Sequence, residues 1–344
     1  MKTKSLQFGK AMSAALFILL LSVVGMKNAL AQTQVATLQH EGNISAYYGI
    51  NAFAEAHAAA IDGDTITLSS GNFNSCTITK AITLHGAGCV SDTLGITPTQ
   101  IGNFTIDVPN DSLFLIIEGI YVNGSICVHN SLYHAVFTRC NIDYIYRDNM
   151  YGSTILGWMY NVQFNNCLIG TATINSFNNN VVFLNCVVNS FYNASPTNGS
   201  APSVLIYNSI IKANNSNNNQ YNLYLYNCIV ANANKIYGTY AGNCIQVGSV
   251  FQNSVQAMDC ITIDSYSDVF ENWDGTFAFD ADFSLKEDVT TSFLGSDGTE
   301  VGIFGGMYPY NPRPNYLILY RCNVAGRTTI DEKLSVDIEV ITGD

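Results

Sequence analysis

The stretch from Val181 to Asn189 reads Val-Val-Phe-Leu-Asn-Cys-Val-Val-Asn, and its first eight residues follow a pattern that recurs along the chain. The pattern is apolar, any, apolar, any, polar, small, apolar, apolar. Its eight copies begin at Phe114, Ala135, Val162, Val181, Val204, Leu223, Thr239 and Val255. The fifth position is most often Asn, and the sixth is always Gly, Ser or Cys. An internal repeat of this kind constrains the fold more strongly than any single motif.

The small sixth positions of successive copies lie 16 to 27 residues apart. A coil of β-strands tolerates this irregular step, because each turn only has to place one strand about 4.8 Å from the last. Alternation within a copy, as in Leu223-Tyr224-Leu225-Tyr226, predicts Leu inward and Tyr outward. The recurrent Asn suits a bend, since Asn tolerates the left-handed backbone region, and stacked amides can form a hydrogen-bonded ladder.

The segment before the repeat predicts a cap and the first turns of such a coil. Residues 50–60 are rich in good helix formers with an amphipathic spacing. Short strands follow at Thr65–Leu68, around Thr77 and Ile78, and at Ile82–Leu84. This order resembles the N-terminal cap and first turns of right-handed parallel β-helix proteins of the pectate-lyase-like superfamily, from about Tyr47 to Leu285. The resemblance implies an all-β fold, a single-stranded right-handed parallel β-helix with a short capping α-helix, and it specifies fold rather than chemistry.

Three regions are expected along the chain. Residues 1–31 form a signal peptide, because three lysines precede an apolar run and a small-x-small site places cleavage between Ala31 and Gln32. Residues 32–290 form the β-helix with its cap. Residues 291–344 form a linker rich in Gly, Pro and Tyr and a C-terminal β tail, in which Tyr316–Arg321 and Leu334–Ile341 alternate like two strands. This hairpin either caps the coil or begins a small appended module.

Composition limits the partners. The formal net charge is −12, and charged residues make up only 12% of the chain, about half the usual share. Neither nucleic acid nor an anionic membrane surface would be attracted, whereas neutral glycans are not excluded. The apolar run near the N-terminus is too short to be a membrane anchor. We expect an exported protein without a transmembrane anchor in the mature chain, located in the periplasm, at the cell surface or outside the cell.

Six cysteines occupy the sixth position of the pattern, which predicts a buried column of free thiols rather than a disulfide framework. They are Cys140, Cys167, Cys186, Cys228, Cys244 and Cys260. Cys76 and Cys89 lie outside this column, and a disulfide between them across the first turn is an open alternative. No cysteine or histidine cluster has zinc spacing, so no metal is expected.

The middle of the coil is poor in ionisable groups. Between Asp148 and Asp259 there is no Asp, Glu, His or Arg, and Lys212 and Lys235 are the only basic residues. A general acid with a partner carboxylate cannot be assembled from that stretch, and neither can a carboxylate calcium site. The five histidines all precede Ala135 and are expected in surface or cap roles.

One local cluster combines carboxylates, an arginine and aromatic rings, and we expect it on a loop. Its catalytic interpretation uses Asp143, Arg147 and Asp148. Its glycan-binding interpretation uses Tyr144, Tyr146, Arg147, Tyr151 and Trp158, because aromatic rings pack on sugars while charged groups bind hydroxyls or carboxylates. A solvated loop whose charges pair with each other is the favoured alternative. The outward Tyr207, Tyr224 and Tyr226 would extend a binding strip along the same face, or are ordinary strand-surface packing.

Two functions are therefore considered. The favoured one is an exported non-catalytic β-helix scaffold, an adhesion or glycan-contacting protein whose partner is a polysaccharide or cell-surface glycan, with no cofactor. The alternative is a polysaccharide lyase or glycoside hydrolase acting on acidic polysaccharide, with calcium required only in this case. That alternative rests on fold analogy. The oligomeric state is left open by the sequence.

Overall fold

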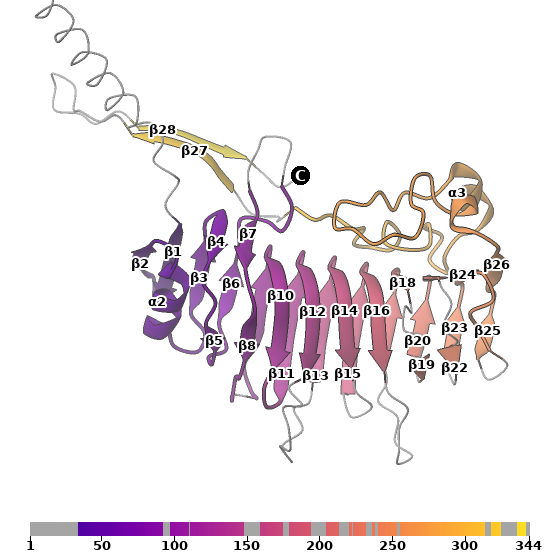
Figure 1. Cartoon of the computed structure of the whole chain (residues 1–344), viewed down its shortest axis with the longest axis horizontal. Helices are drawn as coiled ribbons and strands as arrows, with labels where there is room; N and C mark the ends of the chain where they lie inside the picture. The colour runs from indigo at the N-terminus through magenta and orange to yellow at the C-terminus, as the bar shows by residue number, and fades with distance from the viewer. Residues whose placement is uncertain are drawn as a thin grey trace, which may run out of the picture. The chain divides into compact units, whose positions relative to one another are not determined.

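The structure is a computed structural model that describes most of the chain after residue 33. The described residues are 34–91, 97–109, 111–147, 159–174, 179–193, 204–212, 220–221, 223–231, 236–237, 240–252, 255–313, 318–324 and 336–341. The sites proposed for signal cleavage, Ala31 and Gln32, lie outside these residues. Two parallel sheets wind as a β-solenoid, as the repeat predicts (Figure 1).

The first sheet contains one strand from each turn of the coil. In sheet order it runs β2 (Asn43–Tyr48), β1 (Val35–His40), β3 (Thr65–Leu68), β6 (Thr83–His85), β9 (Leu115–Glu118), β11 (Leu132–Thr138), β13 (Met159–Asn165), β15 (Asn179–Leu184), β17 (Val204–Tyr207), β20 (Leu223–Tyr226), β23 (Tyr240–Gly242) and β25 (Gln256–Met258). From β3 onward each strand pairs in parallel with the next, whereas β1 is antiparallel to both β2 and β3. The sequence pattern did not predict this opening hairpin.

The second sheet follows the same turns on the other side of the core. Its order is β26 (Ile261–Ile263), β24 (Ile245–Val247), β21 (Ile229–Ala231), β18 (Ile210–Lys212), β16 (Val187–Asn193), β14 (Leu168–Ile174), β12 (Asn141–Arg147), β10 (Tyr121–Val128), β7 (Thr99–Ile101) and β4 (Gly71–Phe73), with β8 (Phe104–Ile106) paired to β10 and to β5 (Thr77–Ile78). Two short strands, β19 (Gln220–Tyr221) and β22 (Ile236–Tyr237), pair separately.

Helices are few among the described residues. They are α2 (Ala52–Ala59), the 3-10 turn η2 (Tyr266–Asp268) and α3 (Glu287–Ser292). Helix α2 confirms the predicted cap, and it buries Ala52, Phe53 and Ala56 in the same core as the first strands. Its fourth buried residue, His57, accepts a hydrogen bond from the Thr79 backbone at 3.2 Å, and burial lowers the pKa of the imidazole to about 4.

The bend between the two sheets lies at the recurrent polar position. Asn166, Asn185, Asn208 and Asn227 have φ angles between 45° and 54°, as expected for the left-handed region that Asn tolerates. Each backbone N–H at this position continues the ladder to the next turn, as from Asn185 to the Tyr207 carbonyl oxygen. This corner therefore repeats once per turn in register with the strands.

The first copy of the pattern was aligned wrongly by one residue. Strand register pairs Leu115, not Phe114, with Ala135, and Phe114 is 53% exposed. Gly119 then occupies the left-handed corner with φ 68°, and the larger Ile120 occupies the position of the cysteines. Phe114 and Ile116, which flank Leu115, are also apolar, so the apolar alternation fits the pattern equally well when it is shifted by one residue.

The main core fills the interior of the coil. Phe137, Phe164 and Phe183 are fully buried on successive strands of the first sheet and stack with ring centroids 4.9 Å apart. This spacing is close to the separation of adjacent strands, so identical residues at one position pack on each other along the coil.

A second core covers the outer face of the second sheet. Each of several turns begins that sheet with two adjacent apolar residues, such as Ile210-Ile211, of which Ile211 points into the main core and Ile210 outward. The outward members pack against residues 264–313, which we call the return segment, including Phe270, Trp273 and Ile303. The opening residues of these strands of the second sheet are therefore buried on both faces.

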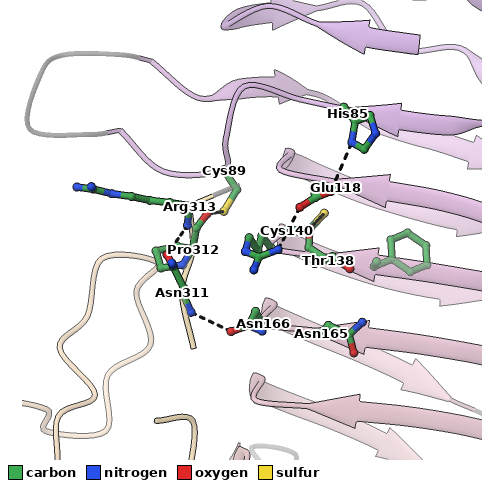
Figure 2. Close-up of polar contacts among 12 residues, drawn as sticks. His85, Cys89, Glu118, Thr138, Cys140, Asn165, Asn166, Asn311, Pro312 and Arg313 are labelled. Atoms are coloured by element: carbon green, nitrogen blue, oxygen red, sulfur yellow. Dashed lines mark hydrogen bonds and ion pairs between the residues drawn. The ribbon is translucent and has the colours of Figure 1, made fainter. Parts of the chain in front are cut away.

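The return segment also covers the Asn corner. Asn227 Oδ1 accepts a hydrogen bond from the Ser296 backbone N–H at 2.9 Å. Asn185 Nδ2 donates to the carbonyl oxygens of Ile303 and Gly305 at 2.9 and 2.8 Å. Asn166 Oδ1 accepts from the Asn311 backbone N–H at 2.8 Å (Figure 2). The segment thus runs back along the coil as its residue numbers rise. The expected amide ladder is wrong for these residues, because their amides bind the return segment instead of each other.

The cysteine column is confirmed as a buried position. Cys140, Cys167, Cys186, Cys228 and Cys244 are fully buried free thiols, and Cys260 is partly buried. Each Sγ donates to the carbonyl oxygen two residues earlier, for example Cys186 to Leu184 at 3.3 Å. Ser209 makes the same contact to Tyr207 at 2.7 Å, which explains why Ser replaces Cys there. Cys76 and Cys89 are also free, and Cys89 Sγ lies 3.7 Å from the Pro312 carbonyl oxygen.

Beyond the return segment, β27 (Ile318–Val324) and β28 (Val336–Ile341) pair as an antiparallel hairpin. The two alternating segments near the C-terminus therefore form the β tail that their pattern predicts.

Asn185→Ala is expected to lower the free energy of unfolding by about 2–4 kcal/mol, because Ala tolerates the left-handed region less well than Asn and the change removes two hydrogen bonds to the return segment. Asn185→Gly should recover the backbone part only. Asn243, with φ 50° and no side-chain hydrogen bond among the described residues, is the matched control. Urea unfolding of the Ala and Gly variants at both positions measures these changes in the free energy of unfolding. Equal losses of stability in Asn185→Ala and Asn243→Ala would contradict the role of the return segment.

The five fully buried column cysteines should resist labelling by a thiol reagent at pH 8 in the folded protein and react after unfolding in guanidinium. They are inaccessible, and burial raises the pKa of Cys140, Cys167 and Cys244 well above the ordinary value. Mass spectrometry of the modified peptides identifies the sites. Failure to react after unfolding without reductant would mean that the column is disulfide-bonded.

Candidate functional site

A cluster of three charged or ionisable side chains lies on the outer face of the first sheet. His85 Nδ1 is 3.4 Å from Glu118 Oε2, and Arg139 Nη1 donates to Glu118 Oε1 at 3.1 Å. Figure 2 shows His85 and Glu118 pointing toward one another from adjacent strands. The Glu118 and Arg139 side chains are only 15% and 14% exposed, so this ion cluster is largely withdrawn from solvent.

Strand register and the corner position assemble this cluster. His85 pairs directly with Glu118 on β6 and β9. Arg139 occupies the left-handed corner after β11, where later turns carry Asn, and its longer side chain reaches back to the preceding turn. Arg139 is thus a charged residue at the corner position, whereas His85 and Glu118 are outward strand residues in direct register.

The two basic neighbours set the ionisation of Glu118. Burial alone would raise the pKa of the carboxyl group, but the hydrogen bond and charge of His85 and the charge of Arg139 outweigh it and lower the pKa. Glu118 is therefore an ionised hydrogen-bond acceptor at neutral pH rather than a proton donor. Catalysis of the glycosidase type needs a second carboxyl group with a raised pKa, and none is part of this cluster in the described chain.

One row of outward side chains connects the cluster with the far end of the coil. Strand pairing places them at successive registers, with neighbouring strands about 4.8 Å apart. In order they are His85, Glu118, Thr138, Asn165, Leu184, Tyr207, Tyr226 and Gly242. We call this row the outer column. Along the coil, the side chains of the outer column change from charged groups to an amide, then to an apolar side chain and finally to aromatic rings.

The aromatic end forms a tyrosine surface made of Tyr207, Tyr224, Tyr226 and Tyr240. The rings of Tyr207 and Tyr226 stack with centroids 5.1 Å apart and planes inclined by 11°, and Tyr240 lies 5.4 Å beyond. Tyr224 stands beside this row and is 41% exposed. Gly242 leaves the space that the Tyr226 and Tyr240 rings fill, since a Cβ there would be 3.4 Å from both. Stacked rings cover each other's faces, so this surface presents ring edges and hydroxyl groups.

The cluster predicted on a loop lies instead on a strand. Asp143, Tyr144 and Tyr146 belong to β12, opposite a register shift in β10, so the loop assignment was wrong. The rings of Tyr144 and Tyr146 lie 4.9 Å apart, and the Tyr144 hydroxyl is 3.2 Å from that of Thr173. Burial raises the pKa of the Asp143 carboxyl group. Asp148, Tyr151 and Trp158, and the side chain of Arg147, lie outside the described residues.

The structure separates the two aromatic groups that the sequence suggested as one strip. Tyr207, Tyr224 and Tyr226 are on strands β17 and β20 of the first sheet, whereas Tyr144 and Tyr146 are on β12 of the second. The expectation of a shared face was therefore wrong. Sequence order does not reveal this, because each repeat contributes one strand to each sheet.

Sequence reasoning missed Glu118 and Arg139 as a pair. The signal was present, since both stand at or beside the corner position that otherwise carries uncharged Asn. Their opposite charges in consecutive copies indicate a contact between neighbouring turns.

Comparison with models of protein families, with curated proteins and with solved structures found no match. Within the described part of the chain, no helix has both the length and the apolar character needed to cross a membrane.

Glu118→Gln is expected to lower the free energy of unfolding by about 1–3 kcal/mol at pH 7, because it removes the charge that two basic side chains contact. The folded pKa of Glu118 lies below its usual 4.5, so this stabilisation is complete above about pH 4.5 and is lost as the pH falls through the folded value. The free energies of unfolding of the wild-type protein and Glu118→Gln should therefore become equal at acidic pH. Urea unfolding at pH 7, 5 and 3 tests this, with the exposed Glu55→Gln as control. A deficit that persists unchanged at pH 3 would contradict the assignment.

Proposed function

We propose that the chain is an exported, non-catalytic β-solenoid scaffold that contacts glycans along the outer face of its first sheet. The observation that supports this best is the outer column, where one straight row joins an ion cluster, an amide and a tyrosine surface. Hydroxyl and amide groups at a regular spacing suit a linear polymer with repeated hydroxyls, and half-buried aromatic rings add apolar contact.

Several features support the first sheet rather than the second as the contact surface. The return segment occupies the outer face of the second sheet with an apolar core. The first sheet exposes the tyrosines instead, and its strands repeat at a constant register over many turns. A long flat surface favours contact with an extended ligand over enclosure of a small one.

A relation of this chain to a known superfamily is part of the same proposal. The cap helix followed by parallel turns favours a relation to the right-handed β-helix proteins of the pectate-lyase-like superfamily. The enzymatic alternative is less well supported, because Glu118 is ionised by its basic neighbours and the tyrosine surface contains no carboxylate. Export and a location in the periplasm, at the cell surface or outside the cell remain inferences from the N-terminal sequence.

A binding assay on the mature protein tests the glycan contact. Affinity electrophoresis in gels containing neutral or uronic-acid polysaccharides should show retardation by at least one polymer. The double variant Tyr207→Ala, Tyr224→Ala should weaken that retardation about fivefold or more, because both aromatic contact and hydroxyl groups are removed. Tyr308→Ala, which removes a tyrosine that is 70% exposed on the return segment, is the matched control and should change nothing. Equal losses in both variants would contradict the proposed surface.

An activity assay tests the non-catalytic part of the proposal. The protein is incubated with the same uronic-acid polysaccharides with and without calcium, and ultraviolet absorbance and new reducing ends are followed. No turnover is expected. Turnover abolished by Arg147→Ala or Glu118→Gln would replace the scaffold proposal with the lyase or hydrolase alternative.

A further inference from the structure

A pocket of about 720 Å³ lies between the coil and the return segment, away from the outer column. Its floor comes from the second sheet through Tyr121, Asn141 and Leu168. Its walls come from residues 279–283 and from Tyr310 and Pro312 of the return segment, and Cys89, Val90, Ser91 and Pro98 close the remaining side. This volume falls in the range of pockets that bind small organic molecules, about 300–1,000 Å³.

Hydrogen bonds and ring contacts hold the walls of this pocket in place. Asn141 Nδ2 donates to the Cys89 carbonyl oxygen at 3.1 Å. Cys89 Sγ lies 3.7 Å from the carbonyl oxygen of Pro312, and both residues are labelled in Figure 2. The ring of Tyr121 meets that of Phe279 edge to face at 5.3 Å, which joins the floor to the return segment. The pocket is therefore formed before any ligand enters.

One side-chain atom of the lining residue Asn141 lacks a hydrogen-bond partner among the described residues. Asn141 is only 2% exposed, and its Oδ1 has no hydrogen bond, although its Nδ2 is bound to Cys89. A buried acceptor without a donor is unfavourable, and a ligand hydroxyl could supply the missing donor after a small side-chain adjustment. A purely apolar ligand would leave this atom unsatisfied.

The remaining lining residues select against anions. Asp280 lines the pocket, and no Lys or Arg does so among the described residues. Burial raises the pKa of Tyr310 well above its ordinary value, so its phenol stays neutral at physiological pH. Aromatic walls made by Tyr121, Phe279 and Phe283 provide apolar contact. A ligand with an apolar face and several uncharged hydroxyl donors fits this combination.

We propose that this pocket binds one neutral sugar residue, with a sugar hydroxyl donating to Asn141 Oδ1 and the ring packed against the aromatic walls. The site is separate from the outer column and does not depend on the glycan contact proposed there. It is supported by the unpartnered Asn141 oxygen, the aromatic residues of the lining, the absence of Lys and Arg from the described lining, and the preformed volume.

Saturation-transfer NMR and calorimetry on the mature protein test this, with methyl glycosides of glucose, galactose, mannose and N-acetylglucosamine as probes. At least one glycoside should bind, and Ala281→Trp, which fills the pocket, should weaken it by at least about tenfold. Ala278→Trp adds the same side chain to the same loop outside the pocket and should leave binding within about twofold. Asn141→Leu should weaken binding by about fivefold or more, with thermal unfolding to verify its fold.

Three results would overturn the proposal. The first is that no glycoside shows saturation transfer from the protein. The second is that Ala281→Trp leaves glycoside binding unchanged. The third is that choline binds more tightly than any glycoside, which would indicate a cation site facing Asp280. The double variant Tyr207→Ala, Tyr224→Ala should not affect this pocket. Failure of the pocket proposal is therefore distinguishable from failure of the polysaccharide contact.

Discussion

The left-handed corner that connects the two sheets once per turn is the constraint on which the rest of this structure depends. From β9 onward, a residue with positive φ stands directly after each strand of the first sheet, and Gly, Arg, Asn and Asp occupy this position in different turns. Because the corner repeats in register, identical side chains stack along the coil, as the core phenylalanines and the buried thiols do. The outer column arises in the same way on the outside.

The return segment determines which surfaces remain available. It forms hydrogen bonds with the side-chain amides of Asn166, Asn185 and Asn227 and buries the outward apolar residues of several strands of the second sheet. The first sheet then exposes its outer face, with the ion cluster at one end and the tyrosine surface at the other. Where the segment arches over Tyr121 and Asn141 it leaves a pocket rather than a packed interface. A single covering element therefore produces both the covered face and the pocket.

Much of the fold could be predicted from local pattern, because strand alternation and the small corner residue are properties of eight consecutive positions. The cap helix, the cysteine column and the terminal hairpin were recognised in this way. The first repeat was misaligned at Phe114 because apolar residues occur on both sides of its register. The site was predicted less well, since Glu118 and Arg139 are separated by a whole turn and meet only through strand pairing.

The sequence by itself determined that the chain coils, where each turn bends and which residues point inward, because these features follow from backbone preference and a period of two. Only the tertiary structure decided which outward surfaces are covered, because that depends on where residues 264–313 return along the coil. The apolar pair that opens several strands of the second sheet is compatible with burial on either face alone, and contact with a distant segment buries both members of the pair. The orphaned Asn141 oxygen and the pocket around it exist for the same reason, since their walls come from parts of the chain that no local pattern connects.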